Sequence, residues 1–328
     1  MRKTFVFILI MLLLFSSGCA GERVAEPVGE TRILLDTVCN LSIYGVPDDS
    51  LVEDAFLLCA EYEALFSISA EGSDIWQINH AKGGSVKTDP QTAAVVSAGL
   101  EYGRFSGGMF DITIGRLSTL WNFKGNASVP TNTELDEARS TVDFRQVIVE
   151  GDTVRLTNPD TWLDLGGIAK GFIADKLAEY VMERGAAGAV IDLGGDVIVA
   201  GEKPDGSPWR LGVRKPFGAQ NELLGVVETE GASVVTSGIY ERQFEEDGVL
   251  YHHILDPTTG MPVRSDVVSV TVVAENTMIG DALSTIILLV GSKRAAELAV
   301  QAPEFIGALL VLDSGEIMEL GDISFEAF

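Results

Sequence analysis

Residues 164–196 read DLGGIAKGFIADKLAEYVMERGAAGAVIDLGGD, and they contain a helix and a strand, each next to a pair of glycines. Apolar residues recur at helical spacing from Ile168 to Glu183, which predicts an amphipathic helix. The short apolar run from Ala189 to Leu193 predicts a buried strand. This pattern predicts helices that pack on a sheet.

The rest of the chain continues this mixture of helices and strands. Apolar stripes predict helices that begin at Ser50 and at Asp89-Pro90, where Asp can cap the first turn and Pro suits it. Further strands are expected at 146–150, 153–157, 234–236, 240–244, 249–255 and 267–274, further helices at 276–290 and 292–301, and a last hairpin turn at 313–315. Without an internal repeat or an evident domain boundary, the sequence predicts a single body of the α+β class.

The N-terminus carries an export signal. Arg2 and Lys3 precede an apolar stretch from residue 5 to residue 15 that is short for a membrane span, and small residues at 16–18 stand directly before Cys19. This resembles a lipoprotein signal peptide, which implies removal of residues 1–18, a lipid on Cys19, a tether over 19–31 and a body over 32–328 outside the cytoplasm. The alternatives are an ordinary signal peptide and an N-terminal membrane anchor. Cys39 and Cys59 could form one disulfide bridge, but Cys59 lies on the apolar face of a predicted helix, so two buried thiols are expected. Their number nearly excludes a cysteine-ligated metal site.

The charge of the chain limits its partners. The 48 acidic and 23 basic residues give a net charge of −25, which repels nucleic acid and anionic lipid. An anionic ligand would therefore need a local source of positive charge, such as a bound cation, a helix N-terminus or a few basic side chains at the site.

Two glycine-rich segments are candidates for ligand contact. In residues 106–115, SGGMFDITIG, paired glycines let the backbone approach a ligand, and Asp111 stands in an apolar run; the alternative is a turn in which Asp111 bonds to backbone. In residues 164–171, glycine amides at a helix start and Lys170 could hold a diphosphate, although the Walker and Rossmann spacings are absent. The alternative is a plain strand-to-helix corner. A related corner at 192–196 follows the next strand and could lie beside it.

Two further segments combine polar groups in ways that suggest chemistry. His252-His253 precede Asp256-Pro257, which fits proton handling; a zinc site would need more ligands than the remaining His80 supplies. Asp281 and Thr285 lie four residues apart on one face of a predicted helix, as a hard cation such as Mg²⁺ requires. The alternative for this pair is an Asp in the first helical turn and a Thr that bonds back to a carbonyl.

Taken in this order, SGGMFDITIG, LDLGGIAKG, VIDLGGD, HHILDPTTG and DALST resemble the ApbE family of FAD:protein FMN transferases, from about residue 33 to residue 320. The resemblance implies a mixed α/β body of the T-fold-like type. In the family's reaction, a hydroxyl of an acceptor Thr or Ser attacks the FMN phosphorus of FAD, and AMP leaves. Family members are typically periplasmic or surface lipoproteins, which agrees with the N-terminal signal.

The resemblance also implies roles for individual residues. Mg²⁺ would be held by the backbone carbonyl of Gly167 with Asp281 and Thr285. His253 and Asp256 would assist proton transfer from the acceptor hydroxyl. The residues expected to contact FAD or line its pocket are Leu35, Ser69, Met109, Phe110, Asp111, Asp164, Lys170 and Leu255, and Ser237, Gly238 and Tyr240 are expected to shape the same cleft.

Three departures from the family pattern bear on function. Leu35-Asp36-Thr37 stands where Met-Gly-Thr is common, Ser69 where many members have Tyr, and Arg116 where Pro is common. The position of Ser69 helps to decide between transfer and hydrolysis, so an Mg²⁺-dependent FAD pyrophosphatase is one alternative function. A non-catalytic flavin-binding lipoprotein is another.

The acceptor is expected to be a separate protein. The chain itself lacks a Ser-Gly-Ala-Thr type of acceptor pattern. The resemblance implies a flavoprotein of a membrane redox complex of the sodium-pumping quinone reductase (Nqr) or Rnf kind, or an extracellular flavoprotein.

Overall fold

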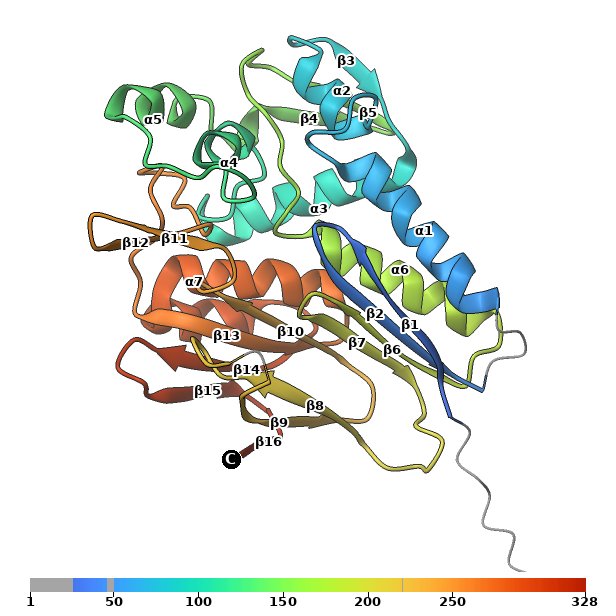
Figure 1. Cartoon of the computed structure of the whole chain (residues 1–328). Coiled ribbons are helices and arrows are strands. Elements are labelled where there is room, and N and C mark those ends of the chain that lie inside the picture. Colours follow the sequence, from blue (N-terminus) through green and yellow to red (C-terminus); the bar gives the residue numbers. More distant parts are fainter. Residues whose placement is uncertain (1–25, 46–49, 220) are drawn as a thin grey trace, which may run out of the picture.

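A computed structural model describes residues 26–45, 50–219 and 221–328 and places one large sheet at the centre of the molecule (Figure 1). All neighbouring strands in this eight-stranded sheet are antiparallel. In spatial order they are β1 (Val28–Leu34), β2 (Thr37–Tyr44), β6 (Gly188–Leu193), β7 (Asp196–Gly201), β10 (Ser233–Gly238), β13 (Val267–Ala274), β14 (Phe305–Leu312) and β15 (Ile317–Gly321). An antiparallel sheet with segregated helices confirms the α+β prediction.

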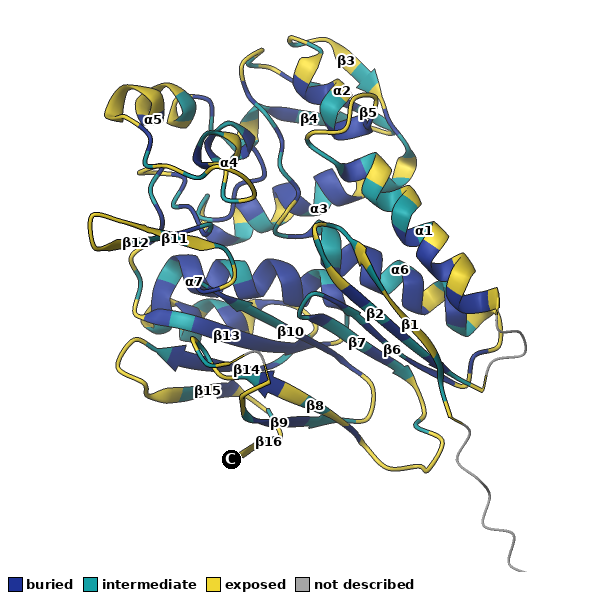
Figure 2. Ribbon diagram, viewed as in Figure 1, coloured by how far each residue is buried: buried dark blue, intermediate teal, exposed yellow. Residues whose placement is uncertain are grey.

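Three helices cover one face of this sheet. They are α1 (Ser50–Phe66), α6 (Ala169–Glu183) and α7 (Thr277–Leu298), and α6 and α7 lie side by side against the strands (Figure 1). Figure 2 shows that α7 is buried along most of its length. The helix is apolar nearly all round because it lies between the sheet and the second part of the molecule. The main hydrophobic core therefore lies between the sheet and these helices.

The second part of the molecule packs on the far side of α6 and α7 from the sheet (Figure 1). Its elements are α2 (Asp74–His80), β3 (Ser85–Lys87), α3 (Pro90–Ser106), α4 (Gly115–Trp121), α5 (Asn132–Arg139), the 3-10 turn Phe144–Gln146, β4 (Val147–Glu150) and β5 (Thr153–Leu156). Strands β3, β5 and β4 form a small antiparallel sheet. Leu117 and Trp121 of α4 pack with Leu135 and Leu255 in a separate apolar cluster, which fixes α4 over the HHILDPTTG segment.

The opposite face of the large sheet has its own cover. Strands β8 (Trp209–Arg214), β9 (Leu223–Thr229) and β16 (Phe325–Ala327) form a three-stranded sheet, and Val213 and Val227 pack there against Val273 and Leu309. A projecting hairpin consists of β11 (Gln243–Glu246) and β12 (Val249–His252). A 3-10 turn at Ala299–Gln301 follows α7.

Several local predictions are confirmed, and one strand is wrong in its position. The helices at 50 and 90, the hairpin of β4 and β5, and the strand at 267–274 are present, and Asp89 caps α3 as expected. The strand expected at 240–244 begins only at Gln243, because the chain turns after Gly238, whose carbonyl accepts from the amide of Glu241. Cys39 and Cys59 are buried free thiols, as predicted.

The N-terminal predictions lie outside the described residues. This applies to the signal peptide over 1–18 and to Cys19. Within the part of the chain that the structure describes, no helix has the length and apolar character needed to cross a membrane.

Candidate functional site

A cavity of about 680 Å³ lies where α4 and its flanking segments meet α6, α7 and the ends of strands of the large sheet. All four candidate segments line it, although they are separated by up to about half of the chain. The volume is in the range of sites that hold a small molecule or cofactor. The cavity therefore brings the glycine segments, a histidine and the Asp281–Thr285 pair to one place.

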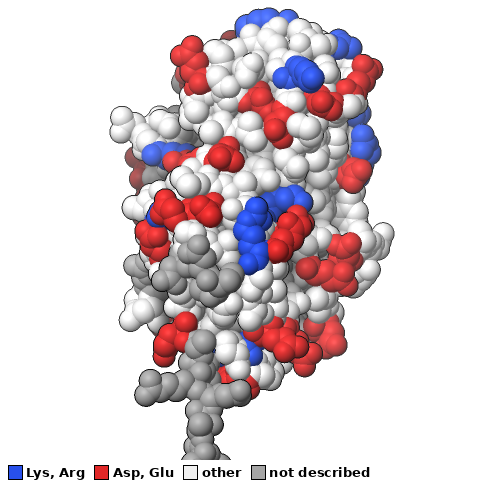
Figure 3. Space-filling view, turned by 90° about the vertical axis from the view of Figure 1, so that its right-hand side faces the viewer, with Lys and Arg blue, Asp and Glu red and all other residues white. Residues whose placement is uncertain are grey.

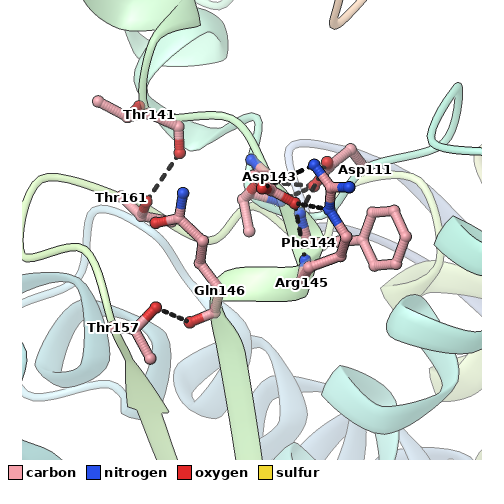
Figure 4. Close-up of polar contacts among 9 residues, drawn as sticks. Asp111, Thr141, Asp143, Phe144, Arg145, Gln146, Thr157 and Thr161 are labelled. Carbon is pink, nitrogen blue, oxygen red and sulfur yellow. Dashed lines mark hydrogen bonds and ion pairs between the residues drawn. The ribbon is translucent and has the colours of Figure 1, made fainter.

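Asp111 organises the loop of the first segment. Its Oδ1 accepts hydrogen bonds from the amide and the hydroxyl of Thr113 (2.8 and 2.6 Å), and its Oδ2 accepts from the amide of Phe144 (2.9 Å; Figure 4). Burial raises the pKa of Asp111, although these hydrogen bonds act in the opposite direction. Asp111 and its neighbours Met109 and Phe110 line the cavity. The carboxylate thus holds the loop shape that presents these two side chains.

The second segment forms the turn that leads into α6. Asp164 accepts from the amide of Gly166 (2.8 Å) and from the hydroxyl of Ser118 on α4 (2.5 Å), so it ties the two parts of the molecule together. The N-cap residue of the helix, Ile168, supplies no side-chain cap, and the amide of Gly171 in the first turn donates instead to the carboxylate of Asp281.

The two glycine corners meet through an ion pair. Lys170 Nζ donates to Asp196 Oδ2 at 2.6 Å, which confirms that the corner at 192–196 lies beside the first. Gly194 and Gly195 make this possible because both have positive φ, +73° and +100°. Burial opposes the charge of Lys170, but the carboxylates of Asp196 and Asp281 outweigh it and raise the pKa of the amine.

Gly167, Asp281 and Thr285 converge from α7 and from the turn before α6. A Cβ atom at Gly167 would lie 3.5 Å from Thr285 Oγ1, so the turn passes directly over this hydroxyl. Asp281 is buried, and its Oδ2 accepts from the amide of Gly171 (3.0 Å). A carboxylate, a hydroxyl and a carbonyl are the oxygen donors that a hard cation prefers, and they fit Mg²⁺. No group of three or more His, Cys, Asp or Glu side chains suited to a metal occurs among the described residues.

Only part of the third segment lines the cavity. His253 lines the cavity, and its Nδ1 is buried without a hydrogen-bond partner among the residues described. Burial, and then the charge of Arg242, lowers the pKa of His253 to about 3. His252 is buried elsewhere and bonds through Nε2 to the carbonyl of Val263 (3.1 Å). Asp256 accepts from the amide and hydroxyl of Thr258 (2.7 and 2.6 Å), so its carboxylate closes the turn at Pro257.

Of the remaining residues expected in the pocket, some line the cavity and others do not. Ser69 and Leu255 line the cavity, as do Ser237 and Gly238. Leu35 packs on the main core, and its amide donates to Glu63 Oε1 (2.8 Å), whereas its neighbours Asp36 and Thr37 face the cavity. Tyr240 instead bonds to Ser269 through its hydroxyl (3.2 Å).

Several cavity residues carried no local signal in the sequence. Lys124 follows α4 and pairs with Asp36 across the cavity at 2.5 Å. Glu241 and Arg242 lie in the turn between β10 and β11. Figure 3 shows how acidic groups are spread over one face of the molecule, with fewer basic groups among them.

Comparisons with known proteins agree with this arrangement. The chain is 31% identical to the FAD:protein FMN transferase of Vibrio cholerae, across 100% of this chain and 99% of that protein. It is 32% identical to the protein of the same name from Treponema pallidum, across 90% of this chain and 88% of that protein.

Solved structures are similar over nearly the whole body. The ApbE protein of Thermotoga maritima superposes with a TM-score of 0.83 at 31% identity, over 90% of this chain and 97% of that one. The flavin transferase ApbE of Vibrio cholerae gives 0.80 at 30% identity, over 90% and 96%. A model of the ApbE family matches residues 35–310, which include all four segments of the cavity, and the chain therefore belongs to the ApbE family.

Proposed function

We propose that this chain is an FAD:protein FMN transferase that moves FMN from FAD to a Thr or Ser hydroxyl of another exported protein and releases AMP. The observation that carries the proposal is the convergence of four distant segments on one cavity, in a member of a family whose relatives bear this name. The cavity offers the cationic side chains of Lys170 and Arg242 to a diphosphate, within a chain of net charge −25.

The reaction is a displacement at phosphorus. The acceptor oxygen bonds to the FMN phosphorus, the bond from that phosphorus to the bridging oxygen breaks, and AMP leaves with that oxygen. His253 lines the cavity and is neutral at pH 7 because its pKa is about 3, so in this proposal it would take the proton of the acceptor hydroxyl. A bound diphosphate would raise this pKa, since a nearby anion favours the protonated imidazole. Lys170 and Arg242 line the cavity and would offset charge on the phosphates.

Asp281, Thr285 and the carbonyl of Gly167 would hold Mg²⁺ in this proposal. The support is their convergence and their oxygen chemistry. Bound Mg²⁺ would neutralise charge that develops on the phosphate oxygens.

The test is a labelling experiment. The purified full-length protein is incubated with FAD, Mg²⁺ and flavoprotein domains that bear acceptor motifs, and the gel is inspected for flavin fluorescence. We expect a fluorescent acceptor band that depends on Mg²⁺ and resists denaturation. Absence of label on every acceptor offered would count against the transferase.

Hydrolysis of FAD to FMN and AMP is a second candidate function. It is favoured by Ser69, which lines the cavity where many members have Tyr and leaves room for water. Measuring AMP release with and without acceptor separates the two. A transferase releases AMP faster when acceptor is present, whereas a pyrophosphatase releases it at the same rate.

The proposed location is the outer face of the cell membrane, with the lipid on Cys19 as anchor. The supporting observation is the N-terminal sequence, and the proposed acceptors are flavoproteins of Nqr-type or Rnf-type membrane complexes or extracellular flavoproteins. Cys19→Ala should move the protein from the membrane fraction to the soluble fraction. Retention in the membrane would favour an apolar membrane anchor instead.

A further inference from the structure

Asp196 is a buried carboxylate next to the cavity that the proposed chemistry does not use. It is 1% exposed and begins β7, directly after the second glycine corner. Its Oδ2 accepts from Lys170, while its Oδ1 has no hydrogen-bond partner among the described residues. A buried carboxylate with an unpaired oxygen destabilises the folded protein, so its presence here needs an explanation.

The ammonium of Lys170 lies among several carboxylates, chiefly those of Asp196 and Asp281. The charges of Asp196 and Asp281 both raise the pKa of Lys170. Burial, and then the charge of Asp281, raises the pKa of Asp196, whereas the ammonium of Lys170 acts in the opposite direction and favours the charged carboxylate. Within the described residues, Lys170 forms an ion pair with Asp196 and none with Asp281. The ammonium is therefore held on the carboxylate of Asp196, while the carboxylate of Asp281 accepts from the amide of Gly171.

Lysine carries its charge on a flexible four-carbon stem. If Asp196 were neutral, the ammonium of Lys170 would find its nearest anion in Asp281. It would then occupy the position that a divalent ion needs, because two cations cannot share one buried carboxylate without strong repulsion.

We infer that Asp196 is a positioning residue that tethers Lys170 and so keeps the Asp281 site open for Mg²⁺. Asp196 does not line the cavity, and it acts through Lys170 rather than on substrate. The inference rests on the proposed function, since Mg²⁺ at Asp281 is part of that proposal.

Calorimetric titration of Mg²⁺ into the full-length protein without FAD tests this directly. Asp196→Asn should weaken Mg²⁺ binding by about 10- to 100-fold, the range seen when an outer-shell partner of a metal ligand is removed. Removing the untethered amine as well, in the double variant Asp196→Asn with Lys170→Met, should restore binding to within a few-fold of wild type. Asp196→Glu, which keeps the charge, should bind better than Asp196→Asn.

Each outcome separates the possibilities. Unchanged Mg²⁺ binding in Asp196→Asn overturns the inference. A double variant that binds Mg²⁺ as weakly as Asp196→Asn overturns it too, because Lys170 would then not be the cause of the weak binding. If the wild-type protein takes up no Mg²⁺, the metal part of the proposed function fails first. Thermal unfolding of each variant shows whether it is folded, and the double variant, which has no unpaired buried charge at either position, keeps the test valid if the single variant unfolds.

Discussion

Asp281 combines a structural hydrogen bond with a proposed metal contact, and a substitution can separate them. Asp281→Asn keeps an oxygen that can accept from the amide of Gly171 but removes the charge. We expect flavin transfer to fall by about 100-fold or more, because weaker binding of Mg²⁺ removes electrostatic stabilisation of the reacting phosphate, and the loss of one such contact costs that much. FAD binding, followed by flavin fluorescence, should change by only a few-fold.

The matched control is Asp175→Asn, which changes a half-buried carboxylate on α6. Asp175 accepts from the amides of Thr277 and Met278 and does not line the cavity. It should retain transfer activity in the folded protein. Equal transfer activity of Asp281→Asn and wild type would contradict a metal role for Asp281.

His252 should make the protein less stable in mild acid. Burial lowers its pKa to about 4 from 6.5, so the unfolded state binds the proton more tightly between these values. Its contribution is complete above pH 6.5 and is lost as the pH falls toward 4. From pH 7.5 to pH 5.0 it amounts to at most about 2 kcal/mol, since 1.5 pH units below 6.5 cost about 1.4 kcal/mol each.

Urea unfolding of wild type and His252→Gln at both pH values measures this contribution of His252 to the free energy of unfolding. Other titrating groups are common to the two proteins, so they cancel in the comparison. The variant should lose less stability between pH 7.5 and pH 5.0 than wild type does. An equal loss in both would show that His252 is not the titrating group.

Local patterns identified the residues whose role depends on spacing. Asp281 and Thr285 were found because one helical turn places them on one face, and Lys170 because it follows glycines at a helix start. Glu241 and Arg242 were missed because their place in the cavity depends on how β10 pairs with β7 and β13, which no local pattern contains.

At the scale of elements, Gly171 sets the distance between α6 and α7. A Cβ atom there would lie 2.4 Å from the carbonyl oxygen of Thr277 and 2.7 Å from the Cα of Met278, both of them backbone atoms that cannot turn away. We expect Gly171→Ala to push the helices apart and destabilise the protein by about 1–3 kcal/mol. Because the amide of Gly171 also donates to the carboxylate of Asp281, the rate of flavin transfer should fall as well.

Gly231→Ala serves as the control, since a Cβ atom at that glycine meets nothing within 4 Å. In chemical unfolding, Gly171→Ala should be less stable than Gly231→Ala, and it should also transfer flavin more slowly. If both behave like wild type, α6 and α7 can separate without cost, and the close approach does not matter.

The elements themselves could be predicted where sequence alone defines them. The expected break between helices at 290 and 292 is present in α7, where Gly291 adopts φ of +75° and Asp266 accepts from the amide and hydroxyl of Ser292. By contrast, no pattern predicted that β2 pairs with β6, because their residues lie about 150 positions apart. Sheet order depends on such distant pairings and on the core they close.

At the scale of the whole molecule, the net charge should slow the capture of FAD. A chain of charge −25 repels an anionic dinucleotide at long range, whereas the cations of the cavity act only at short range. Two of these cations are already paired, Lys124 with Asp36 and Lys170 with Asp196. Arg242 forms no ion pair with any described residue, which leaves it for the ligand.

Salt should therefore speed association. The screening length falls from about 30 Å at 0.01 M to about 10 Å at 0.1 M, so the long-range repulsion weakens while contacts inside the cavity persist. We expect the association rate of FAD, measured by stopped-flow flavin fluorescence, to rise several-fold over this range. Riboflavin, which lacks the phosphates, should associate at a rate that hardly depends on salt. A rate for FAD that falls as salt rises would mean that the cavity cations govern the approach from a distance, and that the acidic surface does not.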